Sequence, residues 1–72
     1  MPLELDLRGV KCPLSWAHAR VRIETLRRGD QIDLLVDEPQ AARDIPKAAE
    51  ATGHHLIAVA AEGSHWRITL EV

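Results

Sequence analysis

A single cysteine, Cys12, in a chain of 72 residues limits how this protein can be held together. Without a second thiol, no internal disulfide can form. A chain of this length buries only about 60% of its unfolded surface, so little stability is in reserve. The core must therefore come from the apolar residues, which make up 46% of the sequence. We expect residues 1–72 to form a single domain, because the length leaves no room for a second one.

The sequence predicts four β-strands, three of them from alternating apolar and polar residues. These strands span residues 3–7, 31–36, 55–61 and 65–72. The last two are separated only by Glu62-Gly63-Ser64, which predicts a hairpin. In the second strand, Leu35 falls on the otherwise polar face, which indicates that part of that face is also covered.

Two segments have the spacing of helices. Residues 13–28 place apolar side chains on one stripe, with Gly29 as the expected C-terminal glycine; the stripe consists of Trp16, Ala19, Ile23 and Leu26. A second helix spans roughly residues 40–52 and ends at Gly53, with Pro39 in its first turn and Asp37 or Glu38 as a cap. Its packing stripe consists of Ala41, Ala42, Ile45, Ala48 and Ala49. Pro46 leaves two alternatives, a helix that begins near Arg43 or one that is kinked or tightly wound at Pro46.

The predicted element order is β-α-β-α-β-β. The economical arrangement is an α+β, two-layer sandwich, in which two helices pack on one face of a four-stranded mixed sheet.

Cys12 lies where the first strand gives way to the first helix. Pro13 suits the first position of a helix, since the N–H it lacks would have no partner there. Cys12 is then expected at the N-cap, where unpaired N–H groups and the helix dipole stabilise a thiolate. Gly9 is expected to supply the backbone conformation for a sharp turn into the cysteine. The sequence therefore predicts a reactive cysteine, although free cysteines are often buried and inert.

The net charge of −2 and the pI near 6.0 argue against a dedicated nucleic-acid binder. The longest apolar run, residues 56–61, is too short to span a membrane, and we expect no membrane association. Charged residues interrupt the N-terminal apolar run, so no signal peptide is expected. A free thiol without an export signal predicts a cytoplasmic protein.

The chain resembles the TusA/SirA-like (YedF-like) family of small sulfur-carrier proteins over nearly its whole length. The resemblance rests on a series of short segments: Asp6-Leu7-Arg8-Gly9, Cys12-Pro13, the helical stripe up to Gly29, Asp37-Glu38-Pro39, Asp44-Ile45-Pro46, Gly53-His54 and the closing hairpin. The family has a β-α-β-α-β-β sandwich and a Cys-Pro-x-Pro motif. Its second proline is replaced here by Ser15, which is expected to change how rigidly the cysteine is presented.

The resemblance implies a sulfur relay. Cys12 would accept sulfane sulfur as a persulfide from a desulfurase or rhodanese-like donor, and pass it to an acceptor protein. The pathways implied are tRNA thiolation, cofactor synthesis or sulfur oxidation. The protein would act stoichiometrically as a monomer, without a cofactor, rather than as a stand-alone enzyme. Pro13 and Gly9 would support Cys12. Arg8 and Lys11 would stabilise the persulfide or help to dock a partner, or else remain solvated.

Other readings of the same residues stay open. The four histidines suggest a metal site, but Cys12 has no partner at ligand spacing, so none is expected. Asp6 and Asp37 are expected as surface or capping carboxylates. Trp16 is expected in the core, with an exposed rim for a partner as the alternative. A non-catalytic interaction module on the same scaffold is the alternative function. RNA binding is suggested only by the two-layer fold, which resembles a domain of a translation initiation factor.

Overall fold

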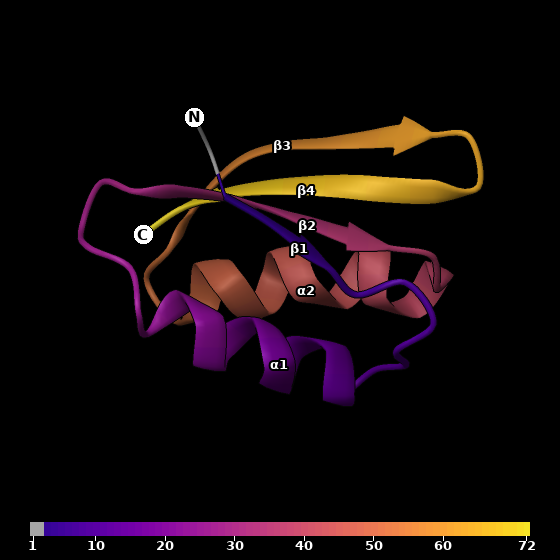
Figure 1. The fold of residues 1–72 in the computed structure, drawn as a ribbon, viewed down its shortest axis with the longest axis horizontal. Coiled ribbons are helices and arrows are strands. Elements are labelled where there is room, and N and C mark those ends of the chain that lie inside the picture. The colour runs from indigo at the N-terminus through magenta and orange to yellow at the C-terminus, as the bar shows by residue number, and fades with distance from the viewer. Residues whose placement is uncertain (1–2) are drawn as a thin grey trace.

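The computed structural model describes residues 3–72 and shows two layers, a sheet with both helices against one face (Figure 1). Residues 1 and 2 of the predicted domain lie outside the described residues. The elements are β1 (Leu3–Asp6), α1 (Leu14–Ile23), β2 (Gln31–Val36), α2 (Pro39–Ala51), β3 (His55–Glu62) and β4 (His65–Glu71). The predicted order and fold class are confirmed, and every strand boundary lies within one residue of its prediction.

The strands are ordered β1-β2-β4-β3 across the sheet. β1 and β2 are parallel, whereas β4 runs antiparallel to both β2 and β3. Because β1 and β2 are parallel neighbours, their carboxyl ends lie at the same end of the sheet. The segment that follows β1, which contains Cys12, therefore lies beside the segment that follows β2.

The core lies between the sheet and the helices. β2 and β4 supply most of its branched side chains, while alanines on α1 and α2 let the helices approach the sheet closely. The buried apolar residues are Leu7, Ala19, Ile23, Ile32, Leu34, Val36, Ala41, Ile45, Ala49, Ile68 and Leu70. β3 forms one edge of the sheet and leaves Ile57 and Val59 exposed.

The outer face of the sheet carries a network of polar side chains around Arg67. Its guanidinium donates hydrogen bonds to three carboxylates, with N–O distances of 2.9 Å to Glu62, Glu4 and Asp33. The Thr69 hydroxyl donates to the second oxygen of Asp33 at 2.8 Å. Leu35 is buried on this face, as its position in the second strand predicted.

α1 ends at Ile23, five residues earlier than predicted. The Thr25 hydroxyl donates to the Arg22 carbonyl at 2.7 Å, and the Leu26 N–H donates to Ile23, so single turns replace the regular helix. Gly29 is therefore not the C-terminal glycine of α1. It lies in the following turn at a φ of 95° and donates to the Val72 carbonyl.

α2 is continuous from Pro39 through Pro46, so the alternative in which it begins near Arg43 is wrong. Pro39 occupies the first turn, as predicted. Gly53, at a φ of 91°, ends the helix in a Schellman motif. In this motif the Gly53 N–H donates to Glu50 and the His54 N–H donates to Ala49.

Candidate functional site

The segment between β1 and α1 enters the site from a fixed point. The Leu7 N–H donates to the Leu35 carbonyl at 2.8 Å, and the Leu7 side chain is buried in the core. The chain then turns through Gly9, whose φ of 84° lies in the region that favours glycine. The predicted role of Gly9 in the approach to Cys12 therefore has a direct backbone basis.

Two carboxylates that follow β2 hold this segment in place. Asp37 Oδ1 accepts the Gly9 N–H at 2.9 Å, and Glu38 Oε1 accepts the Cys12 N–H at 3.1 Å. Glu38 occupies the N-cap position of α2, but its side chain makes no capping hydrogen bond there. The expected capping of the second helix by Asp37 or Glu38 is thus replaced by contacts to the cysteine loop.

The sequence did not predict these two contacts. Their partners are separated by 28 and 26 residues along the chain, so helical or strand periodicity cannot reveal them. The available signal was topological. Acidic residues directly after a strand lie beside the loop that follows its parallel neighbour.

The sequence predicted Cys12 at the N-cap of α1, and this prediction is wrong. The helix begins at Leu14 and Pro13 is the N-cap residue, so Cys12 lies one position further out. The Ser15 N–H donates to the Lys11 carbonyl in a turn that precedes the regular helix. The α-region is also disfavoured for a residue before proline, which keeps Cys12 outside the helix. Cys12 is half-buried, with one side packed against the core.

Arg8 is turned toward Asp6 in a bidentate ion pair. Arg8 Nε and Nη2 donate to the two Asp6 oxygens at 2.9 and 2.8 Å, and the Arg8 backbone N–H adds a third bond. These bonds to Arg8 lower the pKa of Asp6 from 3.8 to about 2. The positive charge of Arg8 is therefore largely shared with Asp6.

Lys11 is exposed beside Cys12 and forms no ion pair within residues 3–72. It lines an open pocket of about 460 Å³, between the segment that follows β1 and the segment that follows β2. The other lining residues are Gly9, Asp37, Glu38 and Pro39. Of the residues predicted to support the cysteine, Gly9, Lys11 and Pro13 lie in the same short loop as Cys12.

The two residues after Leu14 differ in burial, and only Trp16 had a predicted position, in the core. Ser15 is fully buried and starts the buried stripe of α1, which continues through Ala19 and Ile23. Its hydroxyl has no hydrogen-bond partner among residues 3–72. Trp16 is half-buried and packs against the edge of the core instead of inside it.

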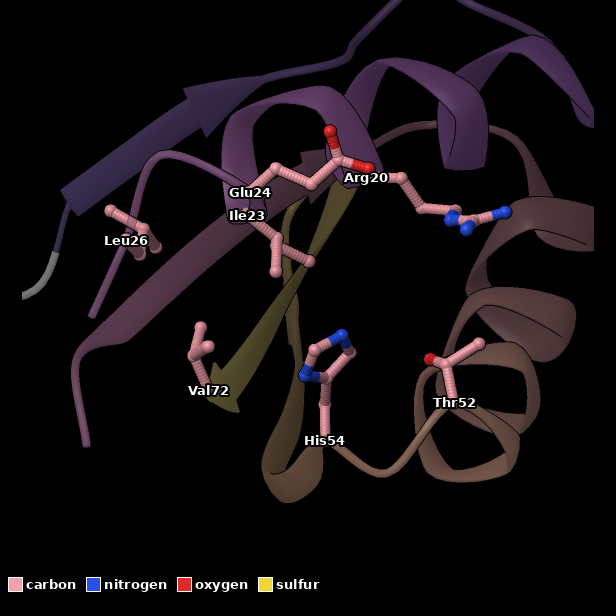
Figure 2. Close-up of a pocket in the computed structure, with 7 residues that line it drawn as sticks. All are labelled: Arg20, Ile23, Glu24, Leu26, Thr52, His54 and Val72. Carbon is pink, nitrogen blue, oxygen red and sulfur yellow. The ribbon is translucent and has the colours of Figure 1, made fainter. Parts of the chain in front are cut away.

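A second pocket, of about 330 Å³, lies at the other end of α1 (Figure 2). Arg20 extends from α1 and Glu24 from the residue just after it. His54, directly before β3, faces them, and Val72 lies on a third side (Figure 2). Cys12 is not among its lining residues. Across the described part of the chain, no three His, Cys, Asp or Glu side chains gather as a metal site.

Residues 3–72 match the protein family described as Sulfurtransferase TusA. The chain belongs to the TusA family. Among its relatives is a "Putative sulfur carrier protein" from Archaeoglobus fulgidus, 29% identical over 93% of this chain and 77% of that protein. A protein of the same name from Thermotoga maritima is 26% identical over 94% of this chain and 87% of its own length.

The TusA-family fold is also found in a solved structure. The SirA-like protein from Desulfitobacterium hafniense superposes with a TM-score of 0.83 at 21% identity, over 97% of this chain and 96% of that one. The resemblance predicted from short segments along nearly the whole chain is therefore confirmed at the level of family and fold. Membership places the chain among sulfur-transfer proteins, which work through contact with other proteins of a sulfur relay. None of the helices in residues 3–72 has the length and apolar composition needed to cross a bilayer.

Proposed function

We propose that this TusA-family protein carries sulfane sulfur as a persulfide on Cys12, between a desulfurase or rhodanese-like donor and an acceptor protein. The Cys12 thiolate attacks the outer sulfur of the donor persulfide. A new bond forms between Sγ and that sulfur as the S–S bond of the donor breaks, and the electron pair leaves with the donor thiolate. The sulfane sulfur keeps its oxidation state, and the same steps in reverse order deliver it to the acceptor.

The observation that carries this proposal is the placement of the only cysteine. Cys12 is packed against the core on one side and open on the other, in a loop fixed at Gly9 and at Cys12 itself. The fixed loop holds the sulfur in one position for attack, which lowers the entropic cost of transfer. No second cysteine is available to resolve the persulfide into an internal disulfide. Pro13 and Lys11 complete the supporting residues, with Lys11 next to Cys12 in the chain and without an ion pair among residues 3–72.

The test is to incubate the protein with a cysteine desulfurase and L-cysteine, or with a rhodanese and thiosulfate, and to measure its intact mass. We expect one added sulfur atom, removable by reductant and absent in Cys12→Ala. A chain that gains no sulfur from either donor, nor from inorganic polysulfide, would contradict the carrier function and favour a non-catalytic interaction module.

A further inference from the structure

The charges of this protein are divided unequally along the chain. Residues 8–28 contain six of the nine Lys and Arg residues but only one of the eleven Asp and Glu residues, which gives a net charge of +5. The rest of the chain has three cations and ten anions, which gives −7. The stretch from the cysteine loop through α1 to the turns after it is therefore strongly basic in sequence, within a protein whose total charge is −2.

Most of this positive charge is available to a partner. Arg8 is paired with Asp6, but the other cations of this segment form no ion pair among residues 3–72 and are exposed. These cations are Lys11, Arg20, Arg22, Arg27 and Arg28. A cluster of unpaired charges of one sign attracts a surface of the opposite sign and raises the rate of association.

The same segment exposes an apolar stripe. Leu14 is 61% exposed and Val21 is 68% exposed, the two largest values among the large apolar residues of the described chain. With the exposed Ala17 between them, they have the i, i+3, i+7 spacing of one helix face. This stripe of Leu14, Ala17 and Val21 begins two residues after Cys12 and extends about 10 Å along α1. By the same spacing, Arg20 and Arg22 lie on opposite sides of it.

We propose that the stripe and its flanking cations form the docking surface for the protein that loads Cys12, and that this donor presents an apolar groove with an acidic rim. The inference rests on the proposed function, because a carrier must hold its donor while sulfur is transferred. The apolar stripe supplies contact area, and the flanking arginines set the orientation. In this orientation the thiol lies at one end of the contact, where the donor persulfide must arrive.

The experiment compares loading of Cys12 in four variants, with the cysteine desulfurase and the rhodanese of the organism that encodes this chain as donors. Arg22→Glu tests the charge, and Arg43→Glu on α2 is its matched control, since Arg43 is also exposed and forms no ion pair in the described part of the chain. Val21→Ser tests the apolar stripe, and Val59→Ser on β3 is its control, at an exposed valine elsewhere. Circular dichroism verifies that each variant is folded.

With at least one of the two donors, we expect Arg22→Glu to lower the second-order rate of loading about tenfold at low ionic strength, with a smaller difference at high salt. Val21→Ser should lower the rate about fivefold at every salt concentration. Both controls should load at the rate of the unaltered protein. All four variants should also react equally with inorganic polysulfide, a small donor that needs no docking surface.

Three results would overturn this assignment. If the protein donors load all variants at the same rate and polysulfide loads them normally, the proposed docking surface is rejected and the carrier function is still supported. If no donor loads Cys12, the carrier function fails, and titration of each donor with Cys12→Ser decides the docking surface separately. The docking surface is then rejected if Cys12→Ser alone binds neither donor, or if adding Val21→Ser or Arg22→Glu leaves its binding unchanged. Loss of binding with these two substitutions, and not with the two control substitutions, supports it. Steeply salt-dependent binding of bulk tRNA that needs Arg22, without an effect on the donors, would assign the surface to nucleic acid.

Discussion

Ser15 lies on the buried face of α1, three residues after Cys12, and its hydroxyl has no partner among residues 3–72. A buried polar group without a hydrogen bond costs about 1–3 kcal/mol. Ser15→Ala should therefore increase the free energy of unfolding by about 1 kcal/mol, because it removes this cost and alanine also favours the helix. Thermal denaturation should show a Tm higher by about 4–8 °C.

The control for this change is Ser64→Ala, at an exposed serine in the β3–β4 turn, where we expect a change within about 0.5 kcal/mol. A lower Tm for Ser15→Ala would show that the hydroxyl has a partner in solution. Loading of Cys12 with sulfur should be unaffected, since the proposed chemistry does not use Ser15.

The Glu38 side chain contacts Cys12 by accepting the backbone N–H of Cys12. The ability of Glu38 to accept a hydrogen bond should therefore matter more than the charge of Glu38. Glu38→Ala should speed hydrogen exchange of the Cys12 amide and cost about 1 kcal/mol, while Glu38→Gln keeps an oxygen acceptor and should preserve both. Exchange at each amide can be followed by NMR. If Glu38→Gln behaves like Glu38→Ala, the charge is what holds the loop.

At the scale of elements, local patterns predicted most of the fold. The strict alternation of β4 and the Schellman glycine of α2 are encoded within a few residues, so their positions were predicted within one residue. The prediction of the C-terminal end of α1 was wrong. The apolar spacing continues to Leu26, whereas Thr25 and Leu26 form separate turns. Helical spacing shows which side chains can share a face, but not where the hydrogen bonds stop.

The site was harder to predict than the fold. The turn at Gly9 and the start of α1 near Pro13 follow from residue type, so the cysteine loop could be located. Its attachment to Asp37 and Glu38 depends on β1 and β2 being parallel neighbours, which no local pattern specifies. The pairing of Arg8 with Asp6 also became evident only from the geometry of their side chains.

Arg67 of β4 connects its own strand to the other three and should be the main polar contributor to the stability of the sheet. It bonds Glu4 of β1, Asp33 of β2 and Glu62 of β3. Without it, the Thr69 hydroxyl is the one side-chain partner that the buried Asp33 carboxylate keeps among residues 3–72. Arg67→Gln should therefore lower the Tm clearly, because a buried carboxylate loses its counter-charge. Arg43→Gln, at an unpaired exposed arginine, should leave it unchanged.

A double variant separates the contributions to this network. Adding Asp33→Asn to Arg67→Gln should recover part of the lost stability, because the charge that needed Arg67 is gone. Strictly additive effects of the two substitutions would show that Arg67 and Asp33 act independently.

The whole molecule should become less stable in acid, in a pH range set by its ion-paired carboxylates. The pKa of Asp6 is lowered from 3.8 to about 2 by Arg8, and that of Glu62 is lowered by Arg67. A lowered pKa in the folded state means that the unfolded chain binds protons first. This stabilisation is therefore complete above about pH 4 to 5 and is lost as the pH falls toward 2.

Urea unfolding at a series of pH values between 5 and 2 gives the free energy of unfolding at each pH and tests this behaviour. Asp6→Asn should flatten the decline in the free energy of unfolding, and Glu50→Gln, at an exposed carboxylate without an ion pair, should not. In NMR titrations, Arg8→Gln should return the midpoint of Asp6 toward 3.8. An unchanged midpoint would mean that the ion pair does not persist in solution.

The half-buried position of Trp16 gives the protein an internal optical reporter. The chain has no Tyr or Phe, and its only other aromatic residue is Trp66, so Trp66→Leu would leave one fluorophore in the molecule. Trp16 lies on the first turns of α1, close to Cys12 in the chain, and is only partly shielded from water. Its emission should respond both to sulfur on Cys12 and to a protein that covers α1, so loading and docking can be timed separately in a stopped-flow instrument without any added dye.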